Sequence, residues 1–161
     1  MLLGGLQKTT LIDYPGKVAC TVFVVGCNFR CPFCHNKDLV TNQLFQQSGI
    51  EPIKEKDLLA FLEKRKKILD GVCISGGEPT IFPRLPVFIS KIKKLGFAVK
   101  LDTNGSNSEM LRKLVNRELI DYIAMDVKSN FDEYQNLIKV KSQKSKVKNK
   151  QSLFSRKLEN R

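Results

Sequence analysis

The chain has 161 residues, of which 42% are hydrophobic, so it is long enough to form one domain with a buried core. Its net charge of +12 first suggests a nucleic-acid-binding protein, but residues 139–161 alone carry nine basic residues and one acidic residue. This segment has too few apolar residues to pack, so we expect a domain over residues 1–138 and a basic, disordered tail over residues 139–161, without specific binding to nucleic acid.

Four apolar runs of strand length are spaced along the chain. They predict strands over residues 18–26, 71–76, 97–102 and 119–128. The runs are apolar throughout rather than alternating, which is typical of parallel strands that are buried on both faces. Because helical patterns lie between them, the sequence predicts the α/β class, with a parallel sheet covered by helices.

Three helices are predicted between these strands. The second ends at Gly96, since glycine is the residue most often found just after a helix. The third is expected to begin at a capping box formed by Ser106 and Glu109. The apolar faces of the three helices are marked by Leu58, Leu62 and Leu69; by Leu85, Phe88 and Ile92; and by Met110, Leu111 and Leu114.

Polar and ligand-bearing residues follow the end of every predicted strand. A cysteine cluster follows the first strand, and a Gly-Gly-Glu-Pro sequence follows the second. Asp102 and Thr103 stand at the end of the third strand, and Asp126 and Lys128 at the end of the fourth. The carboxyl ends of parallel strands meet at one edge of the sheet, where α/β proteins place their sites. We therefore expect a single functional site at this edge.

The cysteine cluster has the pattern C-x3-C-x2-C, formed by Cys27, Cys31 and Cys34. Three thiolates can bind three irons of a 4Fe-4S cluster and leave the fourth iron open for chemistry. The alternative is a zinc site that uses the same cysteines and His35. The adjacent Cys34 and His35 would chelate one ion awkwardly, so the iron-sulfur interpretation is favoured.

These motifs resemble the radical S-adenosylmethionine (SAM) enzymes, and among them the activases of glycyl-radical enzymes. The likeness covers residues 1–138 and is strongest to the anaerobic ribonucleotide reductase activases. It is carried by residues 4–16, by residues 26–36 around the cysteines, and by the Gly-Gly-Glu-Pro and Asp-Thr-Asn-Gly loops in matching order. The resemblance implies a partial, open TIM-like (β/α) barrel with parallel strands, shortened relative to the family.

The resemblance also implies which residues bind cofactors. The three cysteines would ligate the 4Fe-4S cluster, whose open iron would bind the amino nitrogen and carboxylate of SAM, and reductive cleavage of SAM would give methionine and a deoxyadenosyl radical. SAM would be contacted by Phe33, Ser75, Gly76, Gly77, Glu78, Asp102, Thr103 and Lys128, and a monovalent cation by Asp102, Thr103 and Asp126. Without the resemblance, a tight strand-to-helix turn is the favoured interpretation of the glycine loop, and the strand-end residues could form only local hydrogen bonds or salt bridges.

The function implied by the resemblance is removal of a hydrogen atom from a glycine of a partner enzyme. The expected partner is an anaerobic ribonucleoside-triphosphate reductase, with a flavodoxin or ferredoxin as electron donor. Two alternatives remain: a radical SAM enzyme that acts on a small molecule, as 7-carboxy-7-deazaguanine synthase does, and a non-catalytic metal-binding or truncated module. Family members commonly continue for two more strand and helix units after about residue 137, so a C-terminal truncation is a further expectation.

The sequence shows no sign of export or membrane insertion. The longest apolar stretch, residues 18–27, is about half of the ~20 residues that a membrane-spanning helix needs. Residues 1–17 lack the pattern of a secretory signal, and five cysteines do not fit a secreted disulfide framework. Cys20 and Cys73 lie in apolar runs and are expected to be small buried residues. We therefore expect a protein of the reducing cytoplasm without a membrane partner.

Overall fold

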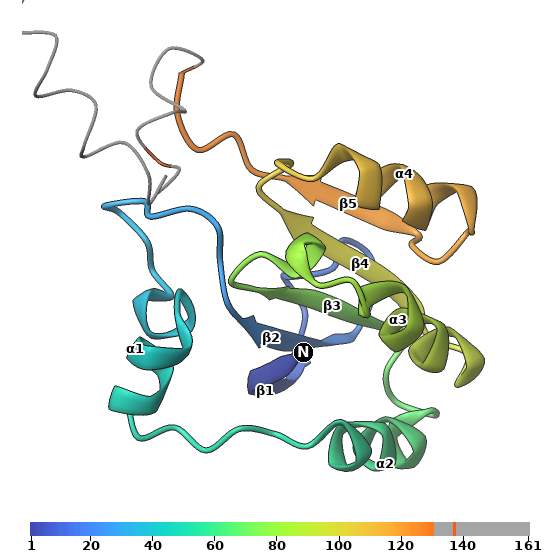
Figure 1. The fold of residues 1–161 in the computed structure, drawn as a ribbon. Coiled ribbons are helices and arrows are strands. Elements are labelled where there is room, and N and C mark those ends of the chain that lie inside the picture. Colours follow the sequence, from blue (N-terminus) through green and yellow to red (C-terminus); the bar gives the residue numbers. More distant parts are fainter. Residues whose placement is uncertain (131–136, 138–161) are drawn as a thin grey trace, which may run out of the picture.

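The computed structural model describes residues 1–130 and residue 137, so the predicted basic tail of residues 139–161 lies outside the described residues. The described chain forms one five-stranded sheet flanked by helices (Figure 1). The strands are β1 (Leu2–Thr10), β2 (Ala19–Val25), β3 (Gly71–Gly76), β4 (Ala98–Thr103) and β5 (Tyr122–Met125). They lie in sequence order, with β2 to β5 parallel and β1 antiparallel to β2. The predicted α/β class with an open parallel sheet is confirmed.

Four helices and two short 3-10 helices connect the strands. They are α1 (Asn42–Gln47), α2 (Glu55–Arg65), α3 (Leu85–Lys94) and α4 (Ser108–Asn116), with η1 (Lys37–Leu39) and η2 (Pro79–Ile81). The helix predicted to stop at Gly96 does so, and the positive φ of this glycine, 92°, is the conformation that glycine adopts most readily. None of the described helices is both long and apolar enough to cross a membrane.

One face of the sheet forms the main hydrophobic core with three helices. Alternate residues of β2, β3 and β4, such as Val22, Ile74 and Leu101, are fully buried against α2, α3 and α4. Because side chains alternate across a strand, the residues between them face the other way. Tyr14, from the segment after β1, covers part of that second face and lies 6.1 Å from Tyr122, measured between ring centres. Ser75 and Asp102, which line the site described below, also lie on this second face.

The antiparallel strand β1 was not predicted. Its pairing with β2 shifts register between Leu3 and Gly5 and again between Gln7 and Thr10. Each shift interrupts the alternation of buried and exposed residues on which a sequence prediction depends. Helix α1 was missed for another reason: it is short, largely polar, and buries a single side chain, Phe45.

The predicted capping box at the start of α4 is wrong. Helix α4 begins at Ser108, and Asn107 caps it by accepting a hydrogen bond from the backbone N–H of Met110 over 3.1 Å. Ser106 belongs instead to the preceding loop, where its backbone N–H donates to Asn104 Oδ1 over 3.0 Å. Ser, Asn and Asp cap helices by the same hydrogen bond, so the pattern fixes the cap only to within one or two residues.

Candidate functional site

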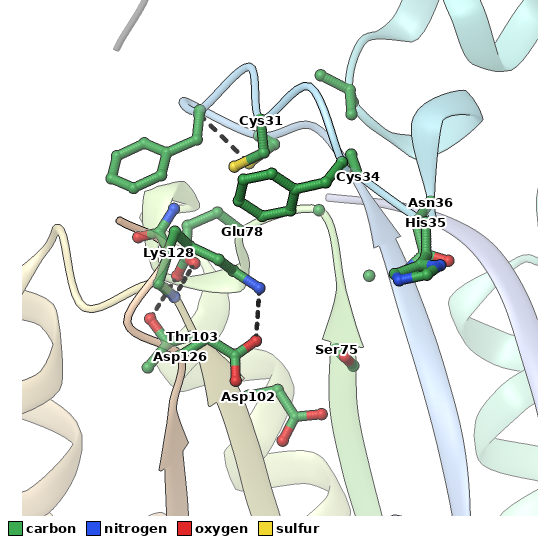
Figure 2. Close-up of a pocket in the computed structure, with 17 residues that line it drawn as sticks. Cys31, Cys34, His35, Asn36, Ser75, Glu78, Asp102, Thr103, Asp126 and Lys128 are labelled. Carbon is green, nitrogen blue, oxygen red and sulfur yellow. Dashed lines mark hydrogen bonds and ion pairs between the residues drawn. The ribbon is translucent and has the colours of Figure 1, made fainter. Parts of the chain in front are cut away.

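A cavity of about 260 Å³ lies at the carboxyl ends of the parallel strands, beneath the loop that carries the cysteine cluster (Figure 2). Loops from four strands meet there, as expected from the topology. The structure brings together every residue that the sequence assigned to the cluster, to SAM or to a cation. Those lining the cavity are Cys27, Cys31, Phe33, Cys34, Ser75, Gly76, Gly77, Glu78, Asp102, Thr103, Asp126 and Lys128.

The cysteine loop leaves the sheet at Gly26 and is closed at its base by backbone hydrogen bonds. Gly26 N donates to Leu39 O over 2.7 Å, and Cys27 N donates to Val40 O over 3.0 Å. The loop is anchored from within by Phe29, which is 2% exposed. These contacts fix both ends of the loop and leave the three cysteines between them.

Arg30 ties the cysteine loop to itself and to the later chain. Its guanidinium donates to the backbone oxygens of Cys27 and Phe29, each over 2.7 Å. Its backbone N–H donates to Leu137 O over 2.8 Å. The Cys27 sulfur itself accepts a hydrogen bond from the backbone N–H of Phe29 over 3.3 Å, so the loop backbone also orients this thiol.

The three thiols of the cysteine loop line one cavity. All three are free and half-buried. Within residues 1–130 and 137, no three His, Cys, Asp or Glu side chains are gathered closely enough to hold one metal ion. A cubane binds each thiolate to a different iron, and its ligands therefore stand farther apart than those of a single ion. Three cysteine thiols on one loop, facing one cavity, match that donor set.

Burial raises the pKa of Cys27 and of Cys31, while the neighbouring charges act on the two thiols in different directions. Burial raises the pKa of Cys27, and the nearby Glu78 carboxylate raises it further, against an opposing hydrogen bond from the backbone of Phe29. Burial also raises the pKa of Cys31, while the Lys128 ammonium opposes the increase. Binding of a positively charged metal centre would have to displace these protons, because thiolates are the metal-binding form.

The Gly-Gly-Glu-Pro loop packs directly against the base of the cysteine loop. Gly77 N donates to Val24 O over 2.9 Å, and Glu78 N donates to Gly26 O over 2.8 Å. A Cβ atom on Gly77 would lie 2.1 Å from the backbone oxygen of Gly26, which is closer than any real contact. Glycine is therefore required here by the close approach of two backbones.

Replacement of Gly77 by alanine should disturb both loops at once. The new methyl group meets backbone atoms of Gly26 that cannot turn aside, so we expect a loss of about 1–3 kcal/mol in the free energy of unfolding. Chemical denaturation measures this loss, and the iron content after reconstitution reports the displaced cysteine loop. The control is Gly5→Ala, because a Cβ there would lie 3.6 Å from the nearest atom, an ordinary contact. Equal stability of the two variants would contradict the prediction.

Glu78 is 1% exposed and joins the loops after β3 and β4. Its Oε1 accepts hydrogen bonds from the backbone N–H and hydroxyl of Thr80 and, over 2.7 Å, from the hydroxyl of Thr103. Its Oε2 accepts from the backbone N–H of Asn104 over 2.7 Å. The carboxylate therefore supports the cavity wall through four protein donors. The resemblance implied that Glu78 contacts SAM, but the sequence did not predict that Glu78 bridges the two loops.

Asn104 extends the bridge to the cysteine loop. Its amide nitrogen donates to Asn28 Oδ1 over 3.0 Å, and the Asn28 amide donates in turn to Ser106 Oγ over 2.8 Å. Asn28 directly follows Cys27, so the loops after β2, β3 and β4 are connected by one set of hydrogen bonds. Asn28 was not among the predicted site residues, and its only signal in the sequence is its place inside the cysteine motif.

Asp102 is held by a buried lysine and a buried cysteine. Lys100 is 7% exposed, and its ammonium forms an ion pair with Asp102 Oδ1. The Cys73 thiol donates to Asp102 Oδ2 over 3.3 Å. Burial lowers the pKa of Lys100, but the hydrogen bond to Asp102 and the nearby negative charges outweigh it, so this pKa lies above its ordinary value. Burial raises the pKa of Cys73 to about 12, which keeps it a neutral thiol.

The remaining predicted residues lie around the opening of the cavity. Lys128 and Asp126 form an ion pair of 2.6 Å across the rim (Figure 2). Ser75 lies on β3 below the cysteine loop (Figure 2). Phe33 is 56% exposed, which is unusual for an aromatic side chain and leaves its ring free to cover a ligand. The expected burial of Cys20 and Cys73 is confirmed, since both are 0% exposed.

The sequence is similar to those of known radical SAM proteins. Residues 21–150 match the radical SAM superfamily. A protein of Methanocaldococcus jannaschii named as a glycyl-radical enzyme activating enzyme is 36% identical over 92% of this chain and 59% of its own length. The pyruvate formate-lyase-activating enzyme of Clostridium pasteurianum is 31% identical over 75% of this chain and 52% of its own length. The chain thus spans little more than half the length of these curated relatives.

A solved structure shares the fold. The crystal structure of QueE from Escherichia coli superimposes with a TM-score of 0.53, covers 65% of this chain and 52% of QueE, and is 23% identical in sequence. This likeness supports the fold, an open sheet of mainly parallel strands. The sequence match over residues 21–150 and the 36% identical relative show that the chain belongs to the radical SAM superfamily.

Proposed function

We propose that this protein is a radical SAM activase that generates a glycyl radical on a partner enzyme, with an anaerobic ribonucleoside-triphosphate reductase as the partner. The observation that carries the proposal is the gathering of the cysteine loop, the glycine loop and the strand-end polar residues around one cavity. Sequence relatives named as activating enzymes of glycyl-radical enzymes give its direction. All of the residues concerned lie within the expected domain of residues 1–138.

In this proposal Cys27, Cys31 and Cys34 bind three irons of a 4Fe-4S cluster. When bound, the reduced cluster and SAM together supply a deoxyadenosyl radical. The chain binds and orients SAM with Ser75, with the backbone of Gly76 and Gly77, and with Asp102, Thr103 and Lys128, all of which line the cavity. Glu78 acts from behind this wall, because its carboxylate already accepts four hydrogen bonds from the protein.

Exclusion of water is the second task of the chain, since a carbon radical must reach its target before it is quenched. Phe33 is the side chain best placed for this task, because it lines the cavity while more than half exposed. Its ring would become buried on contact with the cofactor. An electron donor of the flavodoxin or ferredoxin type, in a cytoplasm that keeps the five thiols free, completes the proposal.

The test is anaerobic reconstitution with iron and sulfide, followed by reduction in the presence of SAM and the reductase. We expect release of deoxyadenosine and the doublet of a glycyl radical in the electron paramagnetic resonance spectrum. The control is a reductase in which the radical-bearing glycine is replaced by alanine, which should abolish the doublet and leave deoxyadenosine release intact.

Three other outcomes would each select a different function. Deoxyadenosine without a doublet on the reductase would favour a small-molecule substrate. Zinc without iron or sulfide after anaerobic purification would favour a metal-binding module. A fully loaded sample that releases no deoxyadenosine would overturn the assignment as an enzyme.

A further inference from the structure

Asp102 lines the cavity, and its side chain is 27% exposed. Lys100 lies two residues earlier on β4, so the two side chains point to the same face of the sheet. Its ammonium contacts Asp102 Oδ1 and lies 3.7 Å from Cys73 Sγ. Since the Cys73 thiol donates to Asp102 Oδ2, both oxygens of the carboxylate are engaged by the chain itself.

The other two residues expected to hold a monovalent cation are also engaged. The Thr103 hydroxyl donates to Glu78 Oε1 over 2.7 Å and accepts from the backbone N–H of Gly105 over 3.1 Å. Asp126 Oδ2 accepts from the Lys128 ammonium over 2.6 Å. Each oxygen-bearing side chain of the expected cation site therefore has a partner from the chain.

Charge gives a second argument against a bound cation. A hard cation is held by oxygen ligands that carry excess negative charge. Here Asp102 and Asp126 are each paired with a lysine, so each aspartate–lysine pair has a net charge of zero. A further cation beside Asp102 would also be repelled by the buried Lys100 ammonium, which water screens little. The expected cation and this donor set do not fit.

We propose that Lys100 takes the place of the monovalent cation, as a positioning residue whose ammonium neutralises and orients Asp102 at the SAM pocket. The inference rests on the proposed function, because it concerns binding of the same cofactor. Lys128 pairs with Asp126 in a comparable way, but its partner is 62% exposed at the side chain and more strongly screened. Lys100 is the buried member and carries the larger effect.

The direct test uses the wild-type protein loaded with its cluster. Binding of SAM is measured by anaerobic calorimetry in KCl, in NaCl and in tetramethylammonium chloride at equal ionic strength. We expect the dissociation constants of SAM in the three salts to agree within about twofold, far less than the tenfold change that a required cation would cause. Binding that requires K⁺ or Na⁺ would overturn the inference and leave the proposed function standing. Failure to bind SAM in all three salts would overturn both.

Substitution of Lys100 supplies the complementary test. In Lys100→Met the Asp102 carboxylate loses its buried partner, so SAM binding in tetramethylammonium should weaken at least about tenfold and should recover when K⁺ or Na⁺ is supplied. Lys100→Arg, which keeps the charge, should bind SAM without added cation. The matched control is Lys93→Met, which removes a lysine paired with Asp121 outside the cavity and should bind like wild type.

A readout independent of the cluster separates this role from a purely structural one. In the cluster-free Lys100→Met variant, K⁺ should raise the midpoint of thermal unfolding relative to tetramethylammonium, because the cation fills the position that the ammonium leaves. The wild-type midpoint should be the same in both salts. A variant that is destabilised equally in all salts would overturn the inference, as would a wild-type midpoint that depends on K⁺.

Discussion

Replacement of Cys31 by alanine is expected to abolish cluster binding and, with it, the release of deoxyadenosine. Two cysteines remain on the loop, and no third thiol lines the described cavity to replace the lost ligand. A cubane needs three thiolates to leave one iron open, so the variant cannot keep the arrangement on which the proposed chemistry depends. We expect the visible iron-sulfur absorbance to be lost and turnover to fall at least about 10³-fold.

Iron and sulfide analysis after anaerobic reconstitution, with deoxyadenosine measured by chromatography, checks this prediction. Cys20→Ala is the matched control, because Cys20 is 0% exposed in the core and burial raises its pKa to about 12. That variant should keep its cluster and lose only a modest amount of stability. A Cys31 variant that retains a full cluster would show that the ligands have been assigned wrongly.

The second large effect is expected on replacement of Glu78 by alanine. The substitution removes an acceptor shared by four donors, among them the backbone N–H groups of Thr80 and Asn104. Buried donors left without a partner each cost about 1–3 kcal/mol, so we expect the free energy of unfolding to fall by about 3 kcal/mol or more. Because Asn104 continues the bridge to Asn28, the cysteine loop should also lose its alignment with the cavity.

Denaturant titration of the cluster-free variant measures the loss of stability, and calorimetry with SAM after reconstitution measures the effect on the pocket. The control is Glu63→Ala, since Glu63 pairs with Lys66 on the surface and should contribute less than about 0.5 kcal/mol. Glu78→Gln keeps one oxygen acceptor and should fall between the two. Equal losses for Glu78→Ala and Glu63→Ala would contradict the bridging role.

The sequence predicted most of the sheet because its central strands are uniformly apolar. Strand β3 has the predicted bounds, and β2 and β4 differ from the predictions by one residue at each end. Strand β5 covers only Tyr122–Met125 of the predicted residues 119–128, because an apolar run does not show where pairing with the neighbouring strand stops. Strand β1 could not be predicted, since its register shifts follow from pairing with β2 rather than from its own pattern.

The site was predictable in its members but not in its contacts. Motif order and the rule that strand ends share one edge were sufficient to gather the cavity residues. The pairing of Asp102 with Lys100 and Cys73 depends on which residues of neighbouring strands lie side by side, and that register is set by the whole sheet. The structure shows local salt bridges at Asp102 and at Asp126, which is the alternative that the sequence left open for these residues.

The backbone hydrogen bonds that join Gly26 to Leu39 and Cys27 to Val40 have a consequence for how this region can evolve. They confine residues 28–38 to a closed segment whose ends keep a constant separation. The loss of conformational entropy on closing this loop therefore occurs when the sheet folds. Exchanges within the segment, apart from the two cysteines, the anchor Phe29 and the bridging Asn28 and Arg30, can then alter the surroundings of the cavity without changing strand order. The chemistry of the cavity and the stability of the sheet can therefore change independently of each other.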